Sequence, residues 1–180
     1  MRILRNATAA LVIDFQEKLF PHIHGHEQLI KNVPILLQGL KALGIPVFVT
    51  EQYVRGLGPT IQPVAAALKG IERIEKSTFS CCDESRFMLA LAASGFENVI
   101  VTGIESHVCV LQTVIDLIHN GYHPVVVEDC ISSRSENDKK IAIERMRREG
   151  ACITTYESIL FELLRSSGTD EFRTISKLVK

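Results

Sequence analysis

The sequence lacks the patterns by which several common classes of protein are identified. It has no run of five or more basic residues, and its net charge is only −1, so nucleic-acid binding is not expected. No apolar run approaches the roughly 18 residues that a membrane span needs, and the first residues, MRILRNATAALVIDFQ, lack the cleavage region of a signal peptide. We therefore expect a soluble cytoplasmic protein without a nucleic-acid or membrane partner.

The cysteines and glycines form none of the usual site signatures. The five cysteines are odd in number, none makes a CxxC pair, and two of them are adjacent, which fits a reducing compartment rather than a disulfide framework or a zinc site. The fingerprints GxGxxG and GxxxxGK[ST] are absent, so we expect no dinucleotide, no P-loop nucleotide and no cofactor. Most of the cysteines are expected to be small buried residues, namely Cys81, Cys82, Cys130 and Cys152.

The sequence does contain a regular alternation of short apolar runs and longer amphipathic segments. Its 180 residues, 46% of them hydrophobic, suit a single domain that spans 1–180. Predicted strands cover 9–13, 46–50, 71–75, 99–103, 123–129 and 151–156, and predicted helices cover 27–43, 84–94, 108–120, 138–149, 159–165 and 170–179. The stretch 51–60 is expected to be a loop and 130–138 a polar turn. Strands that alternate with helices predict a three-layer α/β/α, Rossmann-like fold around a six-stranded parallel sheet.

In such a sheet, ligands bind beyond the carboxyl ends of the strands. The polar residues and thiols found there are Asp14, Gln16, Glu51, Gln52, Lys76, 105–109 and 129–134. An acid, an amine and a thiol are among them, and each also has an ordinary structural explanation. Asp14 could cap a turn, Lys76 could be a solvated lysine, and Cys109 could fill space at the start of a helix.

The functional interpretation of these three residues starts from the position of Cys109. The first turn of a helix presents free N–H groups and a positive dipole end, which stabilise a thiolate. A nearby Lys76 would lower the pKa of the thiol further, and Asp14 could accept its proton. The residue types are therefore those of an activated cysteine nucleophile.

Four segments, in this order along nearly the whole chain, resemble the isochorismatase-like cysteine hydrolases, a family that includes nicotinamidases and carbamoyl-amide hydrolases. The segments are LVIDFQ (11–16), GIPVFVTEQ (44–52), KSTFSCC (76–82) and GIESHVCV (103–110). DCISSRS (129–135) and the closing DEFRTISKLVK are similar to one branch whose substrates are poorly defined. The resemblance implies the strand order 3-2-1-4-5-6 and a catalytic triad of Asp14, Lys76 and Cys109. Because Lys76 would then end an outer strand, its side chain has to reach inward.

The resemblance also implies features of the surrounding site. A cis peptide bond is expected between Ile104 and Glu105, with an oxyanion hole made by the backbone N–H groups of Glu105 and Cys109. Family members usually form oligomers, so a homo-oligomer (a dimer or tetramer) is expected, with 159–164 and the C-terminal segment as candidate interface elements. The candidates for substrate binding are Gln16, which we expect to bond to backbone near the site, and Gln52, Tyr53, Phe79 and His107.

The sequence departs from the nicotinamidases in two respects. Those enzymes carry an Asp-x-His and a later His that bind a metal, whereas this chain has no histidine between Pro46 and Thr102, so we expect no metal. Glu105 stands where they usually keep a small residue, and its carboxylate would disfavour anionic substrates if it faced the pocket. The cluster His22, His24 and His26 has no acidic or cysteine partner nearby, so these are expected to be solvated loop histidines.

Three functions remain open at this point. The first is a metal-independent cysteine hydrolase that cleaves a small amide-like substrate through a thioester, an inference favoured because the isochorismatase branch itself does not need this cysteine. The second is a non-catalytic binding or scaffold protein that retains the fold. The third is a thiol redox protein that uses Cys109 or the Cys81-Cys82 pair.

Overall fold

The computed structural model describes residues 2–180, in which six strands form one sheet. Every neighbouring pair is parallel, and the strand order β3-β2-β1-β4-β5-β6 confirms the predicted order. The strands are β1 (Thr8–Ile13), β2 (Val47–Gln52), β3 (Arg73–Lys76), β4 (Asn98–Ile104), β5 (His123–Ser132) and β6 (Cys152–Thr154).

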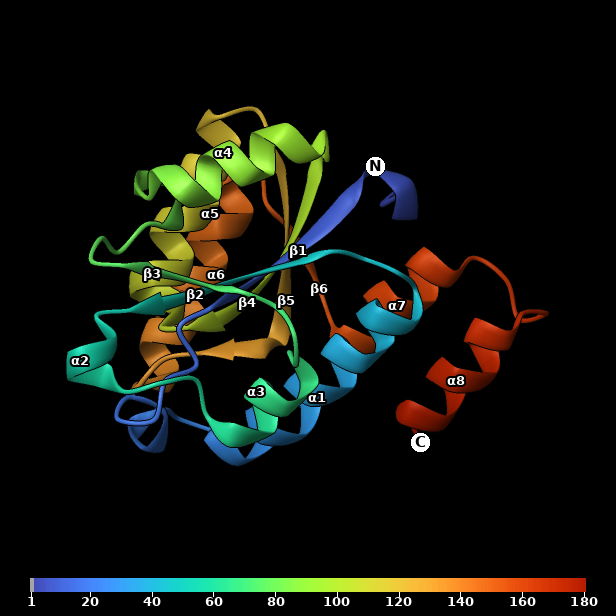
Figure 1. The fold of residues 1–180 in the computed structure, drawn as a ribbon, viewed down its shortest axis with the longest axis horizontal. Helices are drawn as coiled ribbons and strands as arrows, with labels where there is room; N and C mark the ends of the chain where they lie inside the picture. Colours follow the sequence, from blue (N-terminus) through green and yellow to red (C-terminus); the bar gives the residue numbers. More distant parts are fainter. Residues whose placement is uncertain (1) are drawn as a thin grey trace.

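Helices cover both faces of the sheet, which confirms the α/β/α sandwich (Figure 1). One layer holds α1 (His26–Ala42), α3 (Gln62–Ala67), α7 (Tyr156–Leu164) and α8 (Asp170–Leu178), and the other holds α4 (Ser85–Ser94), α5 (Leu111–His119) and α6 (Glu136–Glu149). Each face has its own apolar cluster, because β1, β4 and much of β5 bury apolar side chains in both directions. The remaining helical turns are Arg5–Ala7, Phe20–His22, α2 (Val54–Leu57), Cys81–Asp83 and the π-helical turn Ser106–Val110.

Two predicted boundaries are wrong for identifiable reasons. β5 does not end at residue 129, because after an irregularity Ile131 and Ser132 pair again with β4. The buried Cys130 and Ile131 lie there inside the sheet, although the surrounding letters are polar. The stretch 51–60, predicted as a loop, contains the end of β2 and α2, and α3 follows it without an amphipathic pattern long enough to be recognised.

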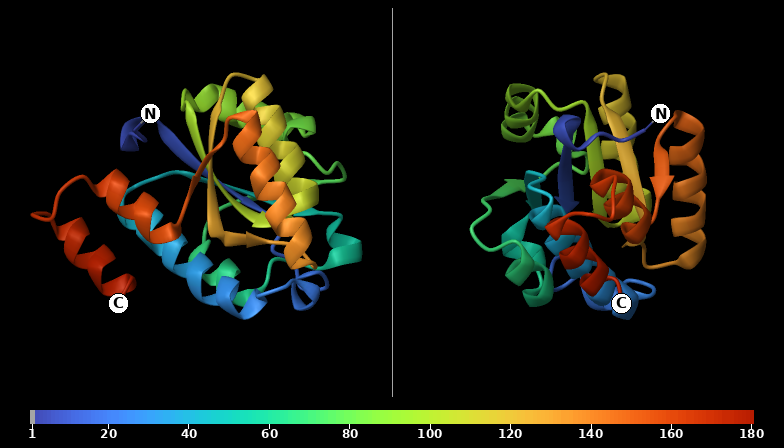
Figure 2. Two further views of the ribbon diagram at one scale, coloured as in Figure 1. Left: turned by 180° about the vertical axis from the view of Figure 1, so that it is seen from behind. Right: turned by 90° about the vertical axis from the view of Figure 1, so that its right-hand side faces the viewer.

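The C-terminal helices pack within the chain itself. The apolar side of α7, with Ile159, Leu160 and Leu163, is buried in the cluster that contains α1. Figure 2 shows α8 beside α1 and α7 at the edge of the molecule, and Ile175 anchors it to that cluster. The side of α7 that carries these three residues is therefore used inside the chain, while Phe161 remains exposed. No helix within residues 2–180 combines the length and the apolar character needed to cross a bilayer.

Candidate active site

Four parallel strands bring their carboxyl ends to one edge of the sheet. β1, β2, β3 and β4 are neighbours in the sheet. Gln52 and Lys76 are the last residues of β2 and β3, and Asp14 and Glu105 directly follow β1 and β4. The register places Ile13 beside Thr50 on one side and beside Gly103 on the other. A Cβ atom on Gly103 would lie 2.5 Å from the Cβ of Ile13, so glycine is what allows β1 and β4 to approach so closely at this edge.

The side chain of Lys76 reaches inward from the edge strand, as the predicted triad requires. Its Nζ lies 2.7 Å from Oδ2 of Asp14, across β2, and the two side chains are 0% and 1% exposed. The carbonyl oxygens of Thr78 and Phe79 accept further hydrogen bonds from Nζ at 3.0 and 3.1 Å. The loop after β3 therefore folds back over the ammonium group and holds it against Asp14.

The charge of Lys76 is maintained by its partners. Burial alone would lower the pKa of the ammonium group, but the attraction of Asp14 outweighs it, helped by Cys81 and Cys109, and the pKa is raised above 10.5. Lys76 is therefore a fixed cation at neutral pH.

A hydroxyl group holds the other oxygen of Asp14. Thr50 Oγ1 donates to Oδ1 of Asp14 at 2.8 Å. Thr50 Oγ1 also lies 3.6 Å from the Sγ of the buried Cys81. Asp14 itself has a positive φ of 55°, and the N–H of Gln16 donates to its carbonyl at 2.7 Å. This tight turn directs the carboxylate back over the sheet edge instead of into solvent.

Cys109 lies in the π-helical turn after β4, not in the first turn of a regular α-helix. Its side chain is buried, and its thiol donates to Oε1 of Gln52 at 3.1 Å. The same oxygen accepts a bond from Lys76 Nζ at 3.2 Å. The amide of Gln52 thus connects the thiol to the Lys76–Asp14 pair, and the structure brings together the three residues predicted as a triad.

The electrostatic environment of the thiol differs from the sequence-based expectation. Burial raises the pKa of Cys109, the negative charge of Asp14 raises it further, and Lys76 lowers it by less than these two. The expectation of a lowered thiol pKa is thus wrong, because the burial of the thiol, which the sequence does not show, adds to the effect of Asp14 and together they outweigh Lys76. At neutral pH Cys109 is a neutral thiol with a carboxylate beside it.

Backbone hydrogen bonds within the loop between β4 and α5 hold this loop in place. The peptide bond between Ile104 and Glu105 is cis, and the carbonyl of Glu105 accepts hydrogen bonds from the N–H groups of Val108 and Val110 at 3.1 and 3.2 Å. The Glu105 carboxylate accepts from the backbone N–H of Arg134 at 3.1 Å and from its Nε at 2.9 Å. Arg134 therefore pairs with Glu105 and compensates its charge.

The candidate substrate-binding residues occupy different environments. Gln16 bonds to backbone as expected, donating to the carbonyls of Gln52 and Gly58 at 2.9 and 2.7 Å. Tyr53 and Phe79 are 57% and 52% exposed, and the backbone of each contacts Lys76. The N–H of Tyr53 donates to the carbonyl of Lys76 at 2.9 Å, and the carbonyl of Phe79 accepts from Lys76 Nζ at 3.1 Å. His107 is bonded through Nδ1 to the buried Ser133 hydroxyl at 2.9 Å, which orients its ring.

Among the remaining histidines and cysteines, Cys81 adjoins this cluster through Thr50, and the others lie farther away. His24 lies 3.9 Å from Glu136, so the expectation that the histidine cluster has no acidic partner is wrong, because α6 brings this residue close in the fold. His26 bonds to the carbonyl of Ile23, and within residues 2–180 no three His, Cys, Asp or Glu side chains are grouped to hold a metal. Cys81 and Cys130 are buried as predicted and Cys82 is half-buried. The prediction for Cys152 is wrong, because β6 is an edge strand and leaves this residue exposed.

Sequence reasoning missed Thr50, and it gave no role to Glu51 and Ser106, which it had placed at the sheet edge. Thr50 reads as an ordinary strand residue, and only the register beside Ile13 shows its role. Glu51 is buried and accepts from the N–H and the hydroxyl of Thr60 at 2.8 and 2.5 Å, which ties the following loop to the sheet. Ser106 Oγ is buried and has no hydrogen-bond partner among the described residues 2–180.

The fold and the site together define a doubly wound α/β protein with an acid, an amine and a thiol buried at the carboxyl edge of its sheet. The family model described as "Isochorismatase domain" matches residues 8–158. The chain therefore belongs to the isochorismatase family, and the resemblance noted in its sequence is confirmed.

Individual relatives agree with this assignment. Isochorismatase domain-containing protein 2A of Mus musculus is 36% identical over 179 residues, which cover 99% of this chain and 85% of that protein. A structure described as the MAR1 ribonuclease from Caenorhabditis elegans is also 36% identical, with a TM-score of 0.94 and coverage of 99% of this chain and 92% of that one. The YcaC gene product of Escherichia coli, described as an octameric hydrolase of unknown specificity, shares the fold at 24% identity, with a TM-score of 0.93 and coverage of 99% and 90%.

Proposed function

We propose that this protein is a hydrolase in which Cys109 attacks small amide-like substrates and forms a thioester intermediate. The observation that carries the proposal is the arrangement around Gln52 Oε1, which accepts both the Cys109 thiol and the Lys76 ammonium group while Lys76 holds Asp14 at 2.7 Å. A nucleophile, a base and a cation thus share one buried site. Membership of the isochorismatase family supports a hydrolase, and the cysteine favours a C–N bond as its target.

The first half of the reaction begins with a proton transfer. Because the pKa of Cys109 is raised, the thiol does not ionise alone and needs Asp14 as general base. Rotation about the Cβ–Sγ bond turns the thiol proton from Gln52 toward Asp14. The thiolate then attacks the carbonyl carbon, and the C=O electrons move to the oxygen. When this intermediate collapses, the C–N bond breaks and the amine leaves with the proton from Asp14.

The second half of the reaction returns the enzyme to its starting state. Asp14 removes a proton from water, and the resulting hydroxide attacks the thioester carbon. Collapse of this second intermediate breaks the C–S bond, releases the carboxylic acid, and the sulfur takes the proton back from Asp14. Lys76 keeps its charge throughout and orients the carboxylate.

A negatively charged oxygen forms in both halves of the reaction. We assign its stabilisation to hydrogen bonds from the backbone N–H groups of Glu105 and Cys109. A free carboxylate beside such a site would repel the oxyanion. The ion pair of Glu105 with Arg134 at 2.9 Å reduces that repulsion, and it also weakens the expected discrimination against anionic substrates.

The substrate is assigned to the space beside the exposed rings of Tyr53 and Phe79, with His107 and Gln52 as polar contacts. We further propose a homo-oligomer in a reducing cytoplasm, as expected from the sequence. The raised pKa values of Cys109 and Cys81 disfavour the redox alternative, because thiolates react with peroxide far faster than thiols.

The test is turnover of a panel of primary amides, N-carbamoyl amino acids and short RNA oligonucleotides. Turnover is measured as the release of ammonia or amine, and for the oligonucleotides as RNA cleavage. RNA is included because a relative of 36% identity is described as a ribonuclease. We expect an amide to be hydrolysed by the wild type and by Cys152→Ala, which removes an exposed thiol outside the site, and we expect Cys109→Ala and Cys109→Ser to be inactive. Amide turnover that survives in both Cys109 variants, or cleavage of RNA alone, would contradict the proposal. No turnover together with a tight protein partner would favour the scaffold alternative.

A further inference from the structure

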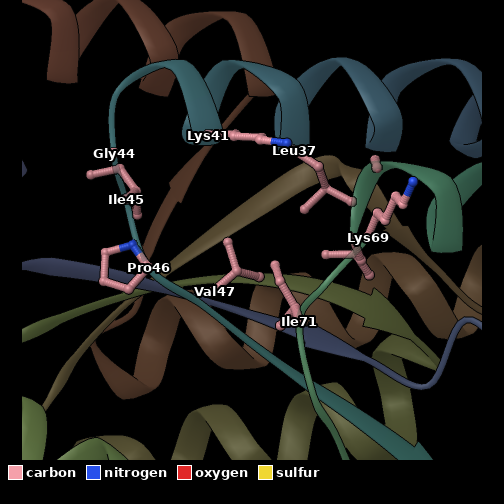
Figure 3. A pocket seen from close by; sticks show the side chains of 10 residues that line it. Leu37, Lys41, Gly44, Ile45, Pro46, Val47, Lys69 and Ile71 are labelled. Carbon is pink, nitrogen blue, oxygen red and sulfur yellow. The ribbon is translucent and has the colours of Figure 1, made fainter.

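A cavity of about 390 Å³ lies at the amino end of β2, on the opposite edge of the sheet from Cys109 (Figure 3). It is lined by the C-terminal part of α1, the first residue of β2 and the segment between α3 and β3. The length of β2 from Val47 to Gln52 separates it from the candidate active site by roughly 16 Å, at about 3.3 Å per residue. The proposed hydrolysis makes no use of this cavity.

The walls of the cavity are apolar. Leu37 and Leu68 are buried, and Val47, Ala67 and Ile71 are partly exposed to the cavity space. Its volume falls within the range of about 300–1,000 Å³ that is typical of small-molecule sites. An apolar chain or ring placed there would be removed from water at about 25 cal/mol for each Å² of its surface.

Among the described residues that line the cavity, the charged ones are Lys41 and Lys69. Both are exposed, and neither makes a salt bridge within the described residues 2–180. Figure 3 shows their amino groups on the α1 side of the cavity, with Val47 and Ile71 on the other side. The cavity therefore combines an apolar interior with two uncompensated positive charges on one side.

From this combination we infer that the cavity binds a small amphipathic carboxylate, with its apolar part against Val47 and Ile71 and its carboxylate between Lys41 and Lys69. Charge complementarity selects an anion, and the apolar walls exclude a fully hydrated one. Lys41 also lies in the last turn of α1, where a cation stabilises the helix dipole, whereas Lys69 follows the end of α3. That role requires no ligand, so a binding measurement separates the two explanations.

The experiment is a calorimetric titration of the full chain with octanoate, and with 1-octanol as the uncharged probe. We expect saturable one-to-one binding of octanoate, weakened at least tenfold in the double variant Lys41→Gln/Lys69→Gln. The matched control Lys31→Gln/Lys177→Gln removes the same charge from exposed positions outside the cavity and should bind like the wild type. Octanol should bind the wild type and the double variant equally.

Two further variants locate the site. Ala67→Phe fills the cavity and should abolish octanoate binding, while the alkylation of Cys109 stays unchanged. Cys109→Ala should leave octanoate binding unchanged. Absence of saturable binding, equal affinity in the wild type and the lysine double variant, or loss of binding in Cys109→Ala would each overturn the inference.

Discussion

Lys76 Nζ and Asp14 Oδ2 are 2.7 Å apart, although Lys76 ends the edge strand β3 and Asp14 follows the central strand β1. The ion pair crosses the intervening strand β2 and is closed to solvent on both sides. A buried ion pair adds little to the free energy of unfolding compared with apolar residues in its place. Removing one partner is nevertheless strongly destabilising, because it leaves a single buried charge. The pair therefore gives the candidate site a preformed charge arrangement before substrate arrives.

Replacing Lys76 with methionine tests this dependence. Lys76→Met leaves the Asp14 carboxylate buried without its cation, and we expect the free energy of unfolding at pH 7 to fall by about 3–5 kcal/mol, together with loss of hydrolysis. Urea unfolding measures the change. Lys31→Met, at an exposed position of α1, should stay within about 0.5 kcal/mol of the wild type. A Lys76→Met variant as stable as this control would show that the pair is not formed.

Thr50 is expected to act through Asp14. Thr50→Val keeps the shape of the side chain but removes the hydroxyl that donates to Oδ1 at 2.8 Å. A buried carboxylate oxygen that loses a donor costs about 1–3 kcal/mol, and we expect a lower kcat with little change in KM. Thr50→Ser restores the donor and should recover most of both quantities. A Thr50→Val enzyme with an unchanged kcat would contradict this positioning role.

Gln52 connects the thiol to the ammonium group, and its exchange for an acid changes a single functional group. Gln52→Glu places a second carboxylate 3.1 Å from the sulfur, which raises the pKa of Cys109 further and should slow its alkylation by iodoacetamide at pH 8. Gln112→Glu, on the exposed side of α5, is the matched control and should have no effect. Equal alkylation rates in both variants would mean that Gln52 is not beside the thiol.

Because the thiol of Cys81 is buried, we expect the folded protein to lose stability in alkaline solution. Burial raises the pKa of Cys81 from 9.0 to about 11, so the folded state keeps a proton that the unfolded state releases. The stabilisation is complete below pH 9 and is lost as the pH rises through 11, by roughly 2–3 kcal/mol for a shift of this size. Urea unfolding between pH 8 and 11 should therefore show a smaller decline in Cys81→Ala than in the wild type. An identical decline in both proteins would contradict the assignment.

The sequence was sufficient to predict the order of elements and the residues that meet at the sheet edge. Asp14, Lys76 and Cys109 lie at or after the carboxyl ends of predicted strands, which converge in a parallel sheet, and the family resemblance distinguished them from the other strand-end residues. Thr50 could not be recognised, because its role comes from register between two strands, which no local pattern records. The direction of the pKa shift of Cys109 was also beyond the sequence, since it depends on how much solvent the folded chain excludes. The cavity beside Lys41 and Lys69 is likewise a gap between elements, visible only after they pack.

The most direct test of the account is the pH dependence of Cys109 alkylation by iodoacetamide, read by peptide mass spectrometry in the wild type and in Asp14→Asn. Burial and the Asp14 charge raise the pKa of the thiol, so the wild type should react slowly at neutral pH and faster as the pH rises. Asp14→Asn removes the neighbouring negative charge and leaves Lys76, so the midpoint should move to lower pH while hydrolysis of any amide substrate is lost. An unchanged midpoint in Asp14→Asn, or a variant that still hydrolyses amides at the wild-type rate, would contradict Asp14 as the base that activates Cys109.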